Sequence, residues 1–327
     1  MERRLFLKTV GGVAGGVALG AKELSALEPH SSPPRQILTD GVPRRSLGQT
    51  GEQLSVFGFP GNCLRHLDQQ ESTAGIRRAL ESGVNYLDVA PAYGRDGECE
   101  IKMGGGLQGL RDQAFLASKT KRRDKAGARE ELETSLKRLK TDHLDLYQMH
   151  FLAKMDDVNK VFGPDGAMET IVKAKEEGKI RHIGFSAHTT LAAVAAMNEY
   201  KFDTVMFPIN FVEYFSFGFG QAVLELAHNQ GVSVIAIKPT SGGAWPEDVA
   251  RAEQKWWYRI IDEEPNLGMA LRFSLSQKNV VSAIPASFIG HFENVISTER
   301  VHEPLTRSEF EKLFTFAKTS NSHFIDE

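Results

Sequence analysis

The chain has 327 residues, of which 41% are hydrophobic and 25% are charged, an ordinary balance for a folded protein. Its net charge of −3, with basic residues interleaved among acidic ones, excludes the strongly basic surface typical of nucleic-acid-binding proteins. The two cysteines, Cys63 and Cys99, are too few for a disulfide framework. No Cys/His cluster has the spacing of a structural metal site, so we expect no metal.

The first 36 residues differ from the rest of the chain. Arg3 and Arg4 open the string RRLFLK, and a glycine-diluted apolar run follows at 9–21, which is the layout of a secretory signal. That run is shorter than the ~20 residues of a membrane-spanning helix. The string resembles the twin-arginine export signal, with Glu2 where Ser or Thr is usual. We therefore expect residues 1–36 to be a signal and linker, read by the twin-arginine export machinery and directing the protein to the periplasm; a disordered basic tail is the alternative.

From residue 44 onwards, short apolar runs alternate with longer amphipathic segments. Residues 44–59 predict a hairpin around a glycine-containing turn, followed by a first inner strand near 55–59. Further strands are predicted, in chain order, at 84–89, 114–119, 144–150, 180–186, 204–210, 232–238 and 280–285. Helical patterns lie between them and end at glycines typical of helix C-termini, at 72–83, 167–179 and 220–231.

Apolar strands alternating with helices predict a parallel sheet that is buried on both faces. Eight strands in this alternation suit a closed (β/α)8 barrel. The competitor is an open doubly wound sheet, which normally has a glycine-rich phosphate loop after an early strand. The glycine run 104–106 lacks the spacing of such a loop and is expected to be a plain loop. We predict an α/β fold, a (β/α)8 TIM barrel over residues 37–327 with an N-terminal β-hairpin cap.

Polar residues stand at the C-terminal ends of the predicted strands, where barrel enzymes carry their active sites. In chain order they are Asp88, Tyr93, Lys119, His150, Ser186, Asn210 and Lys238. Singly, each has an ordinary structural explanation, such as a helix cap, a surface lysine or a core histidine. Together, the first four fit one kind of chemistry.

That chemistry is proton transfer to a carbonyl group as hydride reaches its carbon. A buried Lys119 needs a carboxylate such as Asp88 to keep its charge. A nearby ammonium favours the phenolate, so we expect it to lower the pKa of Tyr93 and make this residue a usable general acid or base. His150 can hydrogen-bond a carbonyl oxygen and fix its orientation.

Several motifs resemble those of the aldo-keto reductase family, along nearly the whole chain from Arg44. They are LGQTG (47–51), NYLDVAPAYG (85–94), FLASKT (115–120), LDLYQMH (144–150) and GKIRHIGFSAH (178–188). The resemblance implies that Asp88, Tyr93, Lys119 and His150 form the family's catalytic tetrad, with Tyr93 as proton donor in reduction. It also implies a small carbonyl or alcohol substrate and NADP or NAD as cofactor, with a slight preference for NADP.

The cofactor side matches the family less closely. Asp88, Ser186, Asn210 and Lys238 are expected to contact the nucleotide, the lysine through its pyrophosphate, but Ala187 replaces the usual Asn. The segment 284–294 has no Lys or Arg for a 2′-phosphate, and His291 is a weak substitute at neutral pH. NAD(H) therefore stays open beside NADP(H), and so does a decayed nucleotide site.

The leading prediction is a nicotinamide-dependent oxidoreductase that is exported folded with its nucleotide. Two alternatives stay open: a non-redox isomerase or lyase that uses Tyr93 and Lys119 for proton transfer alone, and a non-catalytic ligand-binding barrel. The aromatic residues after the seventh strand either line an apolar pocket mouth or form the buried face of a loop helix. They are Trp245, Trp256, Trp257 and Tyr258.

Overall fold

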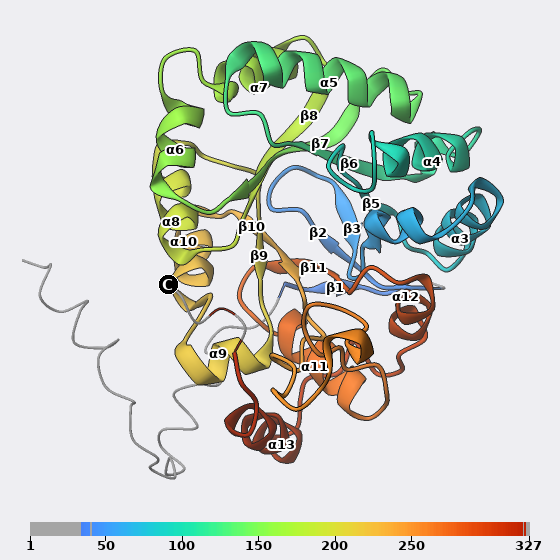
Figure 1. The fold of residues 1–327 in the computed structure, drawn as a ribbon, viewed down its shortest axis with the longest axis vertical. Coiled ribbons are helices and arrows are strands. Elements are labelled where there is room, and N and C mark those ends of the chain that lie inside the picture. Colours follow the sequence, from blue (N-terminus) through green and yellow to red (C-terminus); the bar gives the residue numbers. More distant parts are fainter. Residues whose placement is uncertain (1–33, 40, 323, 325–327) are drawn as a thin grey trace, which may run out of the picture.

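The structure is a computed structural model that describes residues 34–39, 41–322 and 324. The predicted export signal lies outside these residues, except for the last part of its linker. Eight parallel strands form one sheet in which spatial order follows chain order (Figure 1). They are β4 (Phe59–Pro60), β5 (Tyr86–Asp88), β6 (Phe115–Thr120), β7 (Leu144–Leu152), β8 (Ile180–Ala187), β9 (Thr204–Pro208), β10 (Ser233–Ile237) and β11 (Val280–Ile284).

The sheet closes on itself beside its first and last strands. Phe57 pairs in parallel with Ala283 of β11, and the N–H of Gly58 donates to the carbonyl of Ala283 at 3.0 Å. The predicted (β/α)8 barrel is therefore confirmed, and each of its eight strands overlaps one of the predicted strands.

The interior of the barrel is filled by apolar side chains that point inward from the strands. These side chains form a core cluster of their own, which includes Tyr86, Phe115, Leu146, Met206 and Ile235. They alternate along each strand with residues that face the surrounding helices, as the two-residue period of a strand requires. The barrel is thus a packed core, and its chemistry is confined to the two ends.

A small antiparallel sheet covers the N-terminal end of the barrel. It consists of β1 (Gln36–Ile37), β2 (Arg44–Ser46) and β3 (Gln53–Ser55). The predicted hairpin is β2 with β3, and β1 is a third strand that the sequence did not predict. Leu47 and Leu54 belong to the interior cluster, and the buried Arg45 guanidinium donates to the carbonyls of Leu275 and Val280 at 2.7 and 2.6 Å. One end of the barrel is therefore sealed, which leaves the C-terminal end for ligands.

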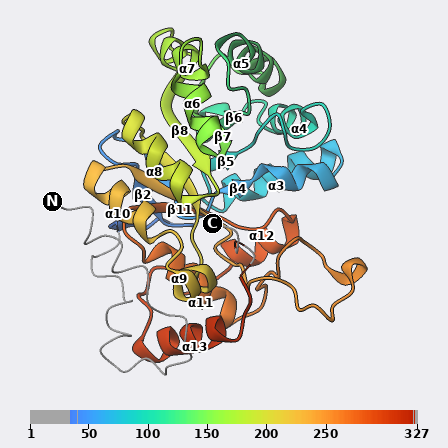
Figure 2. The same cartoon turned by 60° about the vertical axis from the view of Figure 1, so that its left-hand side comes forward.

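Helices surround the sheet (Figure 2). They are α3 (Gln69–Glu81), α4 (Glu98–Gly106), α5 (Lys125–Leu139), α6 (Met155–Phe162), α7 (Ala167–Glu176), α8 (Thr190–Glu199), α9 (Phe211–Phe217), α10 (Gln221–Gln230), α11 (Asn266–Leu275), α12 (Ile289–Ile296) and α13 (Arg307–Lys318), with short 3₁₀ turns at Gly61–His66, Arg111–Gln113 and Arg251–Glu253. The predicted helices are confirmed as α3, α7 and α10. Within the described ranges, no helix has the length and apolarity needed to cross a membrane.

The prediction that glycines 104–106 form a loop is wrong, because they make the last turn of α4. A Cβ atom on Gly104 would lie 2.3 Å from the carbonyl oxygen of Arg138 in α5, and one on Gly106 would lie 2.5 Å from Ile76 in α3. Glycine is needed there because α4 packs closely between two neighbouring helices.

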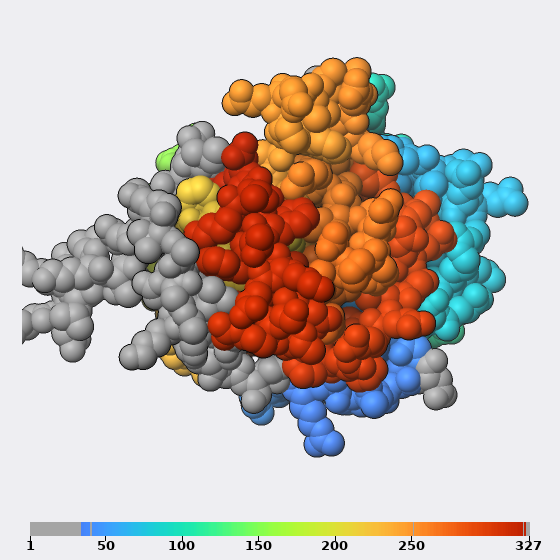
Figure 3. Space-filling model, turned by 90° about the horizontal axis from the view of Figure 1, so that it is seen from below, coloured from blue at the N-terminus to red at the C-terminus, as the bar shows by residue number. Residues whose placement is uncertain are grey.

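The C-terminal part of the chain covers one flank of the barrel. Helix α13 packs on α9, with the rings of Phe215 and Phe310 at 5.1 Å and those of Phe211 and Phe316 at 5.4 Å. In the space-filling view, this segment lies beside the long connection between β10 and α11 (Figure 3). Both segments start or end near the C-terminal end of the barrel, where the candidate site lies.

Candidate active site

The structure places all seven predicted residues at the C-terminal ends of consecutive strands. Asp88 ends β5, Lys119, His150 and Ser186 lie near the ends of β6, β7 and β8, Tyr93 follows β5, Asn210 lies between β9 and α9, and Lys238 directly follows β10. Because parallel strands end at the same side of a barrel, these residues lie around one rim.

A buried ion pair lies at the centre of the tetrad. Lys119 is fully buried, and its Nζ lies 2.5 Å from Oδ2 of Asp88 and donates to the carbonyl of Val89 at 3.0 Å. Burial opposes the charge on Lys119, but the charge and the hydrogen bond of Asp88 outweigh burial and raise the pKa of the lysine. The ammonium is therefore held fixed and charged.

Two residues that the sequence analysis missed complete the surroundings of the carboxylate. The hydroxyl of Tyr86 and the amide of Gln148 donate to Oδ1 of Asp88 at 3.3 and 3.4 Å. Each lies two positions before a predicted site residue on its strand, so it faces the same side of the sheet. That two-residue spacing was the signal available in the sequence.

Tyr93 lies between the lysine and the histidine of the tetrad. The Nζ of Lys119 is 4.8 Å from its ring centroid, and its ring meets that of His150 edge to face at 5.7 Å and 88°. Burial raises the pKa of the Tyr93 phenol and Asp88 adds to this, while Lys119 acts in the opposite direction. The prediction of a lowered pKa is therefore wrong, because burial outweighs the ammonium. Tyr93 holds its proton and is suited to be an acid.

His150 is a neutral imidazole with a free ring nitrogen. It is 8% exposed, and burial together with the charge of Lys119 holds its pKa well below the usual value. Its Nδ1 has no hydrogen-bond partner in the described part of the chain. A neutral histidine in this state can hydrogen-bond to a ligand next to Tyr93.

Two predicted cofactor residues each offer a hydrogen-bond donor. The Oγ of Ser186 accepts from the backbone N–H of Phe151 at 2.8 Å, so its own proton is left for another acceptor. The Oδ1 of Asn210 accepts from the N–H of Glu213 at 3.1 Å and caps α9. Its buried Nδ2 has no partner among the described residues.

Lys238 is a second buried lysine on the rim. It is 6% exposed and has a left-handed backbone with φ of 56°, and its Nζ has no hydrogen-bond partner in the described residues. The Nζ lies 5.1 Å from the ring centroids of both Trp257 and Phe324. Burial lowers its pKa to about 7, although Glu213 acts in the opposite direction. Buried polar atoms without partners are costly. These donors therefore fit a polar, anionic ligand such as a dinucleotide.

His291 is not available to bind a phosphate, so its expected role as a weak substitute cation is wrong. It is buried, with its Nδ1 2.6 Å from Oδ1 of Asp262 and its Nε2 3.0 Å from Oγ1 of Thr240. Burial lowers its pKa despite the nearby carboxylate. The histidine joins α12 to the connection after β10 instead.

The aromatic residues after β10 lie in a bent loop, so the loop-helix alternative is wrong for Trp256, Trp257 and Tyr258. Tyr258 is buried, whereas Trp257 is 44% exposed and lies over Lys238. One of the predicted aromatic residues thus reaches the mouth of the barrel.

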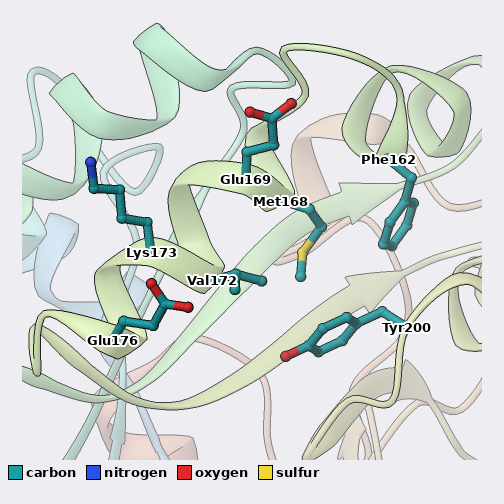
Figure 4. A pocket seen from close by; sticks show the side chains of 7 residues that line it. All are labelled: Phe162, Met168, Glu169, Val172, Lys173, Glu176 and Tyr200. Carbon is teal, nitrogen blue, oxygen red and sulfur yellow. The ribbon is translucent and has the colours of Figure 1, made fainter.

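A surface hollow of about 470 Å³ lies far from this chemistry, on the outer side of the barrel. Figure 4 shows its lining, which includes Phe162 of α6, Met168 of α7 and Tyr200 after α8, and none of the predicted site residues. In the described ranges, no group of three His, Cys, Asp or Glu residues is arranged to hold a metal ion. The rim is therefore the candidate active site.

Comparison with known proteins agrees with this geometry. The sequence profile of the aldo/keto reductase family matches residues 58–257, and the chain belongs to this family. It is similar to the aldo-keto reductase YhdN of Bacillus subtilis, with 33% identity over 190 residues that cover 51% of this chain and 54% of that protein. The chain thus spans about half the length of the curated relatives that head the comparison.

Solved structures share the fold over a longer part of the chain. The holo form of an aldo-keto reductase from Bacillus halodurans superposes with a TM-score of 0.69 and 25% identity, covering 86% of this chain and 98% of that one. An aldo/keto reductase from Klebsiella pneumoniae in complex with NADP and acetate gives a TM-score of 0.61 at 21% identity, covering 81% and 92%. At that identity, the second likeness shows the fold alone.

Proposed function

We propose that the protein transfers hydride between a nicotinamide dinucleotide and a carbonyl or alcohol substrate. The observation that carries this proposal is the buried Asp88–Lys119 ion pair beside a protonated Tyr93 and a neutral His150 at the open end of the barrel. The nicotinamide would supply the hydride when bound. The residues of the chain would supply the proton, the orientation and the electrostatic stabilisation.

Each member of the tetrad has one role in this proposal. The hydroxyl of Tyr93 donates its proton to the carbonyl oxygen during reduction. The ammonium of Lys119 stabilises the phenolate that is left, and Asp88 keeps that ammonium charged and in place. The free ring nitrogen of His150 hydrogen-bonds the carbonyl oxygen and directs it towards Tyr93.

Three further donors on the rim would hold the cofactor. They are the hydroxyl of Ser186, the Nδ2 of Asn210 and the ammonium of Lys238, which would face the phosphates. The related Klebsiella protein was solved with NADP. This chain has no Lys or Arg at 284–294, and its His291 is engaged. Calorimetric titration with NADH and with NADPH measures the preference directly.

Replacement of Tyr93 by Phe tests the proposal. We expect wild-type protein to consume NADH or NADPH with a panel of aldehydes, and Tyr93→Phe to lose about a thousandfold in turnover. Nucleotide affinity should be unchanged, because the substitution removes only the proton donor. The proposal fails if the variant keeps its activity or if wild-type protein binds neither nucleotide. Turnover of a carbonyl substrate without nucleotide consumption would favour the isomerase or lyase alternative.

We also propose that the protein is exported folded to the periplasm by the twin-arginine machinery, with residues 1–36 as the signal. The support is the RRLFLK string that begins at Arg3, together with the apolar run at 9–21. Fractionation of a bacterial host should find the protein in the periplasm and find an Arg3→Lys/Arg4→Lys variant in the cytoplasm. Equal distribution of the two would contradict the proposal.

A further inference from the structure

A cation and two aromatic rings lie beside the tetrad on the β6–β8 side of the mouth. Lys121 directly follows β6, and its Nζ lies 5.7 Å from the ring centroid of Phe151, the residue after His150. The Phe151 ring is 43% exposed and lies 4.5 Å from that of His188. The backbone of Phe151 has a φ of 59°, which is unusual and costly for an aromatic residue. An exposed ring held at such a cost indicates a contact surface for a ligand.

The positive charge of Lys121 is not neutralised by the protein around it. Within the described residues, no carboxylate lies within ion-pair distance of its Nζ. Two neighbouring cations are paired, Lys119 with Asp88 at 2.5 Å and Arg123 with Asp157 at 3.0 Å.

The two histidines of this region, His150 and His188, are neutral, and the charge of Lys121 affects the pKa of both. Burial holds the pKa values of His150 and His188 well below the usual value. The charge of Lys121 acts in the same direction on both, after that of Lys119 for His150 and after that of Lys238 for His188. The Nδ1 of His188, like that of His150, has no partner among the described residues. This side of the mouth is therefore positive and offers free hydrogen-bonding groups.

Lys121 and the proposed phosphate contact, Lys238, follow different strands of the barrel. Strands β6 and β10 lie four positions apart in a closed sheet of eight, so they stand on opposite sides of the barrel. Tyr93 and His150 come from β5 and β7, the two neighbours of β6, so the reacting carbonyl would lie on the Lys121 side.

We infer that the substrate is a carbonyl compound bearing an anionic group, a carboxylate or a phosphate, which binds Lys121 while its body packs against Phe151 and His188. The inference rests on the proposed function, because it names the substrate class of that same site. A flexible, partly exposed ammonium binds an anion as a point charge, so it favours anionic over neutral substrates without selecting one shape.

Matched aldehydes test this inference through kcat/KM. We expect wild-type protein to prefer 4-formylbenzoate over its neutral methyl ester, and Lys121→Met to reduce that ratio about fivefold. Lys121→Arg should retain the preference because it keeps the charge. The control is Arg122→Met, which removes the same charge from the next residue, where the guanidinium lies 3.9 Å from Glu131. A phosphate-bearing aldehyde, 4-formylphenyl phosphate, shows which anion is favoured.

Calorimetric binding of the same three aldehydes to the full chain separates this inference from the proposed function. If no aldehyde is reduced, the proposed function fails. The measured affinities then still show whether the site prefers an anionic ligand over a neutral one. Tighter binding of either anion than of the ester, weakened by Lys121→Met and by added salt, supports the inference. It is overturned by equal or undetectable binding of the anions, or by equal losses in Lys121→Met and Arg122→Met.

Discussion

Two lysines, Lys119 and Lys238, lie at the same rim with almost no exposure to solvent, yet their surroundings differ. Lys119 has a carboxylate at 2.5 Å, whereas Lys238 has two aromatic rings at 5.1 Å and no hydrogen-bond partner in the described chain. The pKa of Lys119 is raised because Asp88 outweighs burial, and burial lowers the pKa of Lys238 to about 7. The protein itself supplies the counter-ion of the first lysine, while the described residues supply no hydrogen-bond partner to the second.

Removal of the Asp88 carboxylate should leave Lys119 without a counter-ion, as Lys238 is in the described chain, and should strongly destabilise the fold. We expect Asp88→Asn to lower the free energy of unfolding by about 3–5 kcal/mol, because it leaves the Lys119 ammonium buried without its counter-ion. Denaturant unfolding measures this change. The double variant Asp88→Asn/Lys119→Met should be more stable than the single one. A double variant that is no more stable would show that lost packing, and not the stranded charge, sets the cost.

Removal of the second lysine should act in the opposite direction. Without ligand, we expect Lys238→Met to leave the free energy of unfolding unchanged or to raise it by about 1 kcal/mol, because Lys238 forms no ion pair within the described residues. Nucleotide affinity should fall about tenfold, as for the loss of a charge-assisted contact. The matched variant Lys238→Arg should bind nucleotide better than Lys238→Met. Unchanged affinity in the Met variant would remove Lys238 from the cofactor site.

A further expected effect is a dependence of stability on pH that belongs to Lys238 alone. Its folded pKa of about 7 lies below the usual lysine value, so between the two the unfolded chain binds more protons than the folded one. Stability should therefore rise with pH across that interval, and the penalty should be complete below it. The difference in unfolding free energy between wild type and Lys238→Met, measured near pH 6 and near pH 9, should shift in favour of wild type at the higher pH. A difference that does not change with pH would contradict the lowered pKa.

Much of this architecture was predictable because buried parallel strands appear in the sequence as short, nearly continuous apolar runs. The run at 144–150, for example, became β7, with residues buried on both faces. The positions of Asp88, Lys119 and His150 followed from the rule that strand ends meet at one rim. The family motifs then gave these residues their expected roles.

The wrong predictions concern properties that depend on distant parts of the chain. The helical state of Gly104 depends on the close approach of Arg138 in another helix. The direction of the Tyr93 pKa shift depends on how deeply the whole fold buries the phenol. His291 is engaged by Asp262, which lies 29 residues earlier. The local sequence pattern contains no information about these properties, because each of them arises from tertiary packing.

The contacts of Arg45 bear on how the chain acquires its structure during synthesis. Its guanidinium binds the carbonyls of residues 230 and 235 positions further along. On the ribosome, the N-terminal hairpin emerges early, but the two carbonyls that bind Arg45 are both present only once β11 has been translated. The contacts that hold Arg45 at the N-terminal end of the barrel are thus completed only near the end of translation.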